Sequence, residues 1–304
     1  MAENIGNQDF CGVFPVFQTP FNDDLSIDFG TLESEIQWLF DNGVQGIVMA
    51  MVSEVLRLSS EERDQLATFS CKIGSSRGGV IISVGAESTN TAVRHAKHAC
   101  DVGAAAVMAI PPTTTSSGDA ELMKYYEAII KSINIPLIVQ DASGYVGAPM
   151  SLKMQSSLLE KFGDRIMYKP EAVPIGPRLS LLRDLTNGQA HIFEGSGGIS
   201  LVDSFHRGIK ATMPGADLCW ALVALWKALK SNDETRINAI NGPLTSIISL
   251  QNSLDAFLAI EKYLLVKQQI FKNEIIRGPV SFVLDNETRS EVDRLFNLLL
   301  QAVA

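Results

Sequence analysis

Short apolar runs alternate along the chain with longer stretches of helical period. Eight runs have the length and composition of buried strands; they cover residues 12–21, 43–50, 78–86, 104–112, 135–142, 165–171, 190–198 and 208–216. Amphipathic stretches such as 28–43 and 90–103 lie between them. Apolar strands that alternate with helices predict an α/β fold with a parallel sheet, and eight units predict a closed (β/α)8 barrel. The alternative is an open doubly wound sheet, which is disfavoured because no G-x-G-x-x-G turn follows the first run.

The alternation of apolar runs with helical stretches ends after about residue 229. Helical patterns fill residues 234–251, 253–271 and 288–304, and the only strand-like run among them is 278–284. We therefore predict a catalytic barrel over residues 1–229 and a C-terminal helical region over 230–304 that packs on it. This helical region shows little obvious chemistry.

Composition narrows the class of protein. The chain has 304 residues, of which 46% are hydrophobic, and a net charge of −9, which excludes a general nucleic-acid surface. Four cysteines without short spacing predict free thiols in a reducing compartment, and hence a cytoplasmic protein. No basic and apolar leader opens the sequence, and no apolar run reaches the roughly 18 residues that span a bilayer. We expect no export and no membrane insertion.

Candidate chemistry gathers at the predicted strand ends, where barrels of this type carry their active sites. The sixth run ends in Lys169, Pro170 and Glu171. A lysine at an apolar barrel mouth is expected to have a lowered pKa, because desolvation disfavours the ammonium. Its neutral amine could condense with a ketone to a Schiff base, and Glu171, two positions on and on the same side, could act as the base. The alternative is an ordinary solvated ion pair of the two side chains.

Other strand-end and nearby residues are predicted with simpler roles. Lys210 lies early in the eighth run and is expected at the rim. Asp141 is expected either to orient the turn after the fifth run or to contact the substrate directly. Glu54 is expected to hold its loop by accepting backbone hydrogen bonds. His95 and His98 have a spacing that could hold a metal with a third ligand, but a solvated helix face is the preferred interpretation, so we predict no metal site.

Several of these segments together resemble a known family. They are VFPVFQTPFNDDLSID at 13–28, NGVQGIVMAMVSEVLRLSSEER at 42–63, DVGAAAVMAIPP at 101–112, PLIVQDA at 136–142 and EGSGG at 194–198. The chain resembles, over essentially its whole length, the dihydrodipicolinate synthase and N-acetylneuraminate lyase family of Schiff-base-forming (β/α)8 enzymes. The resemblance implies that Lys169 forms the Schiff base with a 2-keto acid, without a cofactor. It also implies a homotetramer built as a dimer of dimers.

Departures from the family pattern indicate a branch. Gln140 replaces the tyrosine that usually ends the fifth strand, SGYVG at 143–147 lacks the usual arginine, and Met51 and Val52 replace a threonine pair. These features resemble the L-2-keto-3-deoxyarabonate dehydratases, in which a glutamate also follows the lysine by two residues. The branch implies that Glu171 removes the C3 proton and that Gln140 binds substrate hydroxyls or a water.

The remaining substrate contacts are predicted from the same resemblance and from the strand ends. The substrate carboxylate is expected at the backbone N–H groups and hydroxyl of Val52 and Ser53. Gly195, Ser196 and Thr19 are further predicted substrate contacts.

Three functions stay open at this stage. The preferred one is a carbon–oxygen lyase that dehydrates a 2-keto-3-deoxy sugar acid. The second is a pyruvate-dependent aldolase or synthase, a carbon–carbon lyase in which Tyr145 or a water replaces the missing tyrosine. The third is a non-catalytic member of the family that binds a keto acid.

Overall fold

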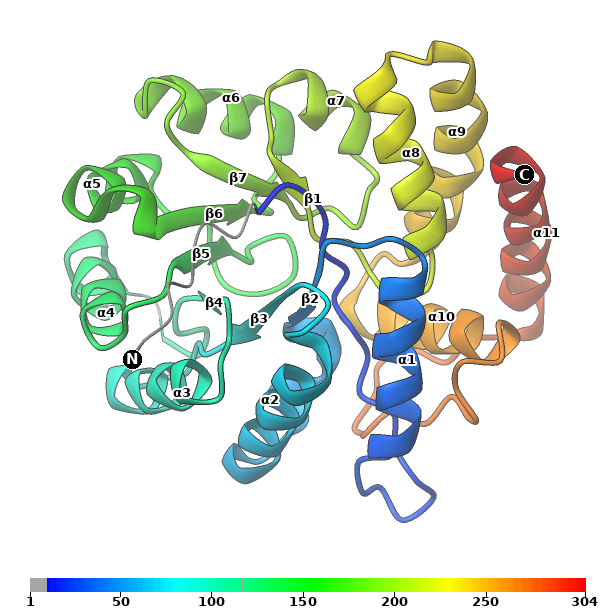
Figure 1. Cartoon of the computed structure of the whole chain (residues 1–304), viewed down its shortest axis with the longest axis horizontal. Helices are drawn as coiled ribbons and strands as arrows, with labels where there is room; N and C mark the ends of the chain where they lie inside the picture. Colours follow the sequence, from blue (N-terminus) through cyan, green and yellow to red (C-terminus); the bar gives the residue numbers. More distant parts are fainter. Residues whose placement is uncertain (1–9, 116) are drawn as a thin grey trace.

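The strands form one closed parallel ring. The computed structural model describes residues 10–115 and 117–304, and Figure 1 shows the ring enclosed by helices. The strands are β1 Gly12–Val13, β2 Gly46–Met49, β3 Gly79–Ser83, β4 Ala106–Ala109, β5 Leu137–Asp141, β6 Ile166–Pro170, β7 His191–Glu194 and β8 Ala211–Thr212. Each lies within one of the eight predicted runs, and β1 pairs with β8. The (β/α)8 prediction is confirmed, and the open sheet is excluded.

Helices cover the outside of this ring. The barrel helices are α1 Phe29–Asp41, α2 Ser60–Gly74, α3 Thr89–Asp101, α4 Asp119–Lys131, α5 Leu152–Phe162, α6 Ile175–Leu185, α7 Leu201–His206 and α8 Cys219–Ser231. The C-terminal helices are α9 Glu234–Leu250, α10 Leu254–Lys267 and α11 Asn286–Val303, and they gather beside α8 and α1 (Figure 1). The run 278–284, which resembles a strand in sequence, forms no strand. Within the described residues, no helix combines the length and apolarity needed to cross a membrane.

The ladder of hydrogen bonds is uneven around the barrel. Strands β5 and β6 pair over five residues, whereas β1 and β8 pair over two. Between the β1 side and β2 there is an isolated bridge from Val16 to Val48, supported by a bond from the Phe17 N–H to the Val48 carbonyl at 3.1 Å. We call β8, β1 and β2, with the residues 14–21 that continue β1, the seam.

The period of two along β6 places the lysine. Met167 packs in the barrel interior, while the next side chain, Tyr168, turns outward and donates to the Gln155 carbonyl at 2.7 Å. Lys169 follows on the inner side, above the packed interior. That interior contains Phe14, Val48, Ile81, Met108, Ile138, Met167 and Phe193. The strand pattern therefore delivers the amine to the barrel mouth.

Candidate active site

A cavity at the carboxyl ends of the strands brings most of the predicted site residues together. It is lined by Val52, Gln140, Lys169, Glu171 and Gly195, all predicted from sequence. Since these residues come from the ends of β2, β5, β6 and β7, the barrel itself assembles the site.

The central feature of this cavity is a buried triad of polar side chains. Lys169 Nζ lies 3.1 Å from Glu171 Oε1, and Gln140 Nε2 donates to Glu171 Oε2 at 2.8 Å. Gln140 and Lys169 are direct partners in the β5–β6 register. All three residues are at most 4% exposed. The alternative of a solvated ion pair is therefore wrong, because water does not surround the pair.

The backbone explains why the two charged side chains meet. The Glu171 N–H donates to the Asp141 carbonyl at 3.0 Å, so the chain stays extended beyond Pro170. Lys169 and Glu171 consequently point to the same face. Burial raises the pKa of Glu171, and the Lys169 charge and the Gln140 hydrogen bond offset part of this rise. A carboxylate whose pKa is raised, in contact with an amine, is suited to accepting a proton.

Gly195 leaves the space that this pair occupies. A Cβ atom at this position would lie 2.6 Å from Glu171 Cγ and 3.0 Å from Lys169 Cε. Either distance is shorter than an ordinary carbon–carbon contact. Glycine is therefore required here by the close approach of the lysine and glutamate side chains.

Three predicted substrate contacts lie outside the cavity lining. Ser53 donates its hydroxyl to the Phe17 carbonyl and its N–H to the Ala50 carbonyl, the latter at 2.9 Å. Thr19 Oγ1 donates to the Ser53 carbonyl at 2.6 Å. Ser196 Oγ accepts the Ser200 N–H at 2.9 Å. These hydroxyls fix loops behind the cavity, while Val52 lines it.

The loop after β5 adds a hydroxyl to the cavity. Tyr145 contributes to the lining, and burial raises the pKa of its phenol, which keeps it protonated. Asp141 holds this loop by accepting the Ser143 hydroxyl at 2.6 Å and the Met150 N–H at 3.1 Å. The predicted role of Asp141 in orienting the turn is confirmed.

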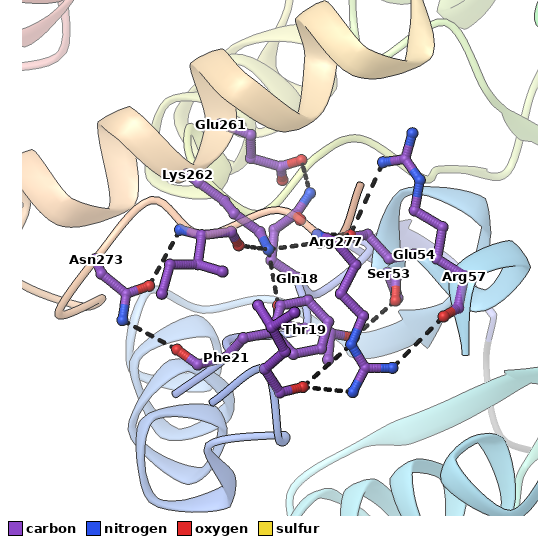
Figure 2. Close-up of polar contacts among 12 residues, drawn as sticks. Gln18, Thr19, Phe21, Ser53, Glu54, Arg57, Glu261, Lys262, Asn273 and Arg277 are labelled. Atoms are coloured by element: carbon purple, nitrogen blue, oxygen red, sulfur yellow. Dashed lines mark hydrogen bonds and ion pairs between the residues drawn. The ribbon is translucent and has the colours of Figure 1, made fainter. Parts of the chain in front are cut away.

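Helix α10 supplies residues that sequence reasoning missed. Phe257 lines the cavity, and Glu261 and Lys262 are fully buried and point toward Gln18 and Thr19, which follow β1 (Figure 2). The C-terminal region, expected to show little obvious chemistry, thus contributes a wall of the cavity through Phe257. One signal was available: Glu261 and Lys262 stand between apolar residues on both sides, as buried charges do.

The structure also shows where the other charged residues considered in the sequence analysis lie and what they contact. Glu54 accepts the Arg277 N–H at 3.1 Å, as predicted for a loop-holding residue. Lys210 is exposed, in agreement with a rim position. His95 is only 5% exposed and lies 3.2 Å from Asp64, so the expectation of a solvated face was wrong for it. Over residues 10–115 and 117–304, no group of three or more acidic, histidine or cysteine side chains is arranged to hold a metal.

An eight-stranded parallel barrel with a buried lysine–glutamate pair at its mouth defines an enzyme-like (β/α)8 site. Residues 9–163, half of the chain, match the dihydrodipicolinate synthetase family. The chain therefore belongs to this family of lyases.

The chain is similar to several individual proteins of that family. The chain is 31% identical over 177 residues to the 4-hydroxy-tetrahydrodipicolinate synthase of Methanococcus aeolicus, covering 58% of this chain and 60% of that protein. It is 28% identical over 211 residues to the L-2-keto-3-deoxyarabonate dehydratase of Azospirillum brasilense, covering 67% of each. The crystal structure of dihydrodipicolinate synthase from Rhodopseudomonas palustris superposes with a TM-score of 0.88 at 24% identity, covering 96% of this chain and 99% of that one. This last likeness concerns the fold.

Proposed function

We propose that the protein is a cofactor-independent Schiff-base lyase that dehydrates a 2-keto-3-deoxy sugar acid. The observation that carries the proposal is the buried contact of Lys169 with Glu171, with Gln140 on the second carboxylate oxygen. The similarity to the Azospirillum brasilense dehydratase supports the choice of reaction.

The first step uses the amine. Lys169 Nζ attacks the C2 carbonyl of the keto acid, and water leaves to form a protonated Schiff base. Glu171, with its raised pKa, takes the proton that the lysine ammonium must lose before attack and returns it to the C2 oxygen as that oxygen leaves in water, so the carboxylate is ionised again. The iminium then withdraws electrons from C3 and acidifies its protons.

The second step uses the carboxylate as a base toward carbon. Glu171 removes a proton from C3, and the enamine that forms expels the C4 hydroxyl as water. Hydrolysis of the Schiff base returns the water lost at its formation, so the net change is the loss of one water. No electrons are gained or lost, and the reaction requires no redox cofactor.

The remaining cavity residues bind and orient the substrate in this proposal. Gln140 also has its amide oxygen available toward a substrate hydroxyl or a water. The backbone at Val52 takes the α-carboxylate, with Ser53 and Thr19 holding that loop from behind. Gly195 leaves room for the Schiff base, and Ser196 fixes the turn that follows it.

A second candidate function is a pyruvate-dependent aldolase or synthase. One observation favours it: Tyr145 lines the cavity and could supply the hydroxyl that Gln140 lacks. Pyruvate among the products would identify this carbon–carbon lyase. The third candidate, a non-catalytic keto-acid binder, is disfavoured by the buried amine and base.

The test is reduction by borohydride with pyruvate and, separately, with 2-keto-3-deoxy-pentonates, followed by peptide mass mapping. We expect an adduct on Lys169, and turnover of the pentonate to a product lighter by one water. Lys210→Ala is the matched control, because this lysine is exposed and should leave the adduct unchanged. No adduct on Lys169 with any keto acid would overturn the mechanism.

Two further properties complete the proposal. The family resemblance supports a homotetramer, which light scattering of the purified protein measures. The four cysteines without short spacing support a cytoplasmic location, which cell fractionation measures.

A further inference from the structure

The buried ammonium of Lys262 joins four parts of the chain (Figure 2). Lys262 on α10 is fully buried and donates to the Thr19 carbonyl at 2.9 Å and the Ile275 carbonyl at 2.6 Å. Its third partner is the carboxylate of Glu54 in the loop after β2. All three N–H donors of the ammonium are therefore satisfied.

The surroundings of this ammonium show a built site. Its nitrogen lies 4.7 Å from the centre of the Phe21 ring, which adds a favourable cation–π contact. The second oxygen of Glu54 accepts the Arg277 N–H at 3.1 Å, so both oxygens of that carboxylate are used. Removing a charge from water is costly unless its partners are arranged in this way.

The carboxylate end of this ion pair belongs to the loop that lines the cavity. Glu54 has a φ of +58°, a left-handed conformation that a residue with a side chain seldom adopts. The two residues before Ser53, Met51 and Val52, line the cavity. The Thr19 hydroxyl holds Ser53, and Lys262 holds both the Thr19 carbonyl and Glu54.

We infer that Lys262 is a positioning residue that fixes the cavity lining at Met51 and Val52 and thereby sets the affinity for the keto acid. This inference rests on the proposed function for its ligand. The helical region then contributes to substrate binding through a side chain that touches no substrate.

The competing interpretation is that Lys262 only stabilises the fold. The two can be separated by kinetics. Loss of folded protein lowers the apparent maximal rate with an unchanged KM, whereas a displaced binding loop raises KM and leaves the maximal rate nearly unchanged.

The first experiment measures the pyruvate concentration that gives half-maximal borohydride trapping on Lys169. Lys262→Met removes the ammonium that pairs with Glu54 Oε1 and leaves that oxygen buried, so the double variant K262M/E54Q, which removes both charges of this pair, is measured beside it. Lys272→Met is the matched control, because Lys272 is 71% exposed and pairs with Asp28 at the surface. We expect the half-saturating concentration to rise about tenfold in the double variant and to stay within about twofold in the control.

The second experiment does not depend on Schiff-base formation. Hydrogen exchange of the amides in residues 50–57 is expected to speed up by about tenfold in K262M/E54Q and to be unchanged in K272M. Unchanged exchange and unchanged half-saturation in folded K262M/E54Q would overturn the inference. If the wild-type protein forms no adduct while exchange rises, the proposed function fails and the role of Lys262 in holding the loop stands.

Discussion

Strands β5 and β6 pair in register over five residues, whereas β1 and β8 in the seam pair over two. The proposed reacting groups Gln140, Lys169 and Glu171 all lie on the well-paired side. Their positions are fixed by backbone hydrogen bonds, which leave little freedom for the side chains they carry. Catalytic geometry is best kept on such rigid elements.

The seam is held in a different way. The Gln18 amide donates to Glu261, which also accepts the Ala216 N–H, and Lys262 donates to the Thr19 carbonyl. Side chains of α10 thus add to the backbone hydrogen bonds that join β8, β1 and β2. The comparison shows that backbone hydrogen bonds position the proposed catalytic residues, whereas side chains of α10 hold the seam and the proposed substrate-binding loop. Mutations should therefore affect the two regions separately.

The largest effect is expected on the well-paired side. Lys169→Ala should lower turnover by at least about a thousandfold, because no other amine is in place to form the Schiff base. Its melting temperature should stay close to that of the wild type, since the backbone ladder is untouched, and Glu171 keeps the Gln140 hydrogen bond and can take up a proton once the lysine charge is gone. Rate measurements with the pentonate substrates check this, and residual activity above about a thousandth would contradict the role of Lys169.

The seam should show the largest effect on stability. Glu54→Ala leaves the Lys262 ammonium buried without its anion, which should lower the free energy of unfolding by about 3 to 5 kcal/mol. Lys272→Ala removes an exposed pair and should cost less than about 1 kcal/mol. Urea denaturation of both variants measures the difference, and equal values would mean that the buried pair does not hold the seam.

Adding one methyl group at Gly195 should change the position of Glu171 in the cavity while the protein stays folded. Gly195→Ala places a Cβ atom 2.6 Å from Glu171 Cγ and so displaces the base. We expect kcat to fall by about a hundredfold with the fold intact. Gly242→Ala, on α9 with no atom within 4 Å of its new Cβ, is the control. Equal kcat values for Gly195→Ala and Gly242→Ala would contradict the prediction, because the Lys169–Glu171 pair would then tolerate displacement.

Stability should also respond to pH through Asp217, a buried acid between β8 and α8. Burial raises the pKa of Asp217 from 3.8 to about 7. Between these values the folded protein holds a proton that the unfolded chain has released, so stability falls as pH rises. Asp217→Asn removes this dependence and should reduce the loss between about pH 4 and pH 7 by about 1 to 3 kcal/mol. Denaturation at several pH values measures this. If the free energy of unfolding changes with pH equally in the variant and the wild type, the predicted role of Asp217 is contradicted.

The smallest effect concerns the base itself. The Gln140 hydrogen bond lowers the pKa of Glu171, so Gln140→Met should raise that pKa further. Because the base must be ionised, activity should be lost at a pH higher by about half to one unit as the solution is made acidic. The pH profile of kcat/KM measures the shift, and a shift toward lower pH would exclude Glu171 as the base.

Much of the fold and the reacting pair could be predicted from sequence. Buried parallel strands are continuous apolar runs, and a lysine and glutamate at the end of one of them stand out. The spacing of two residues also implied a shared face. The contacts of Ser53 and Thr19 could not be predicted, because they depend on the left-handed turn at Glu54. The partners of Lys262 carry no local signal, since they are distant in sequence.

The contacts of Gln18 with Glu261 and of Thr19 with Lys262 each join residues separated by 243 positions. During translation, at about 5 to 20 residues per second, β1 therefore waits roughly 10 to 50 seconds for α10 to be synthesised. Until then the nascent chain has Lys169 and Glu171, but it lacks the Phe257 side of the cavity and the contacts of Glu261 and Lys262 with the seam. The last step in making the active site is thus the arrival of a helix that contains none of the reacting groups.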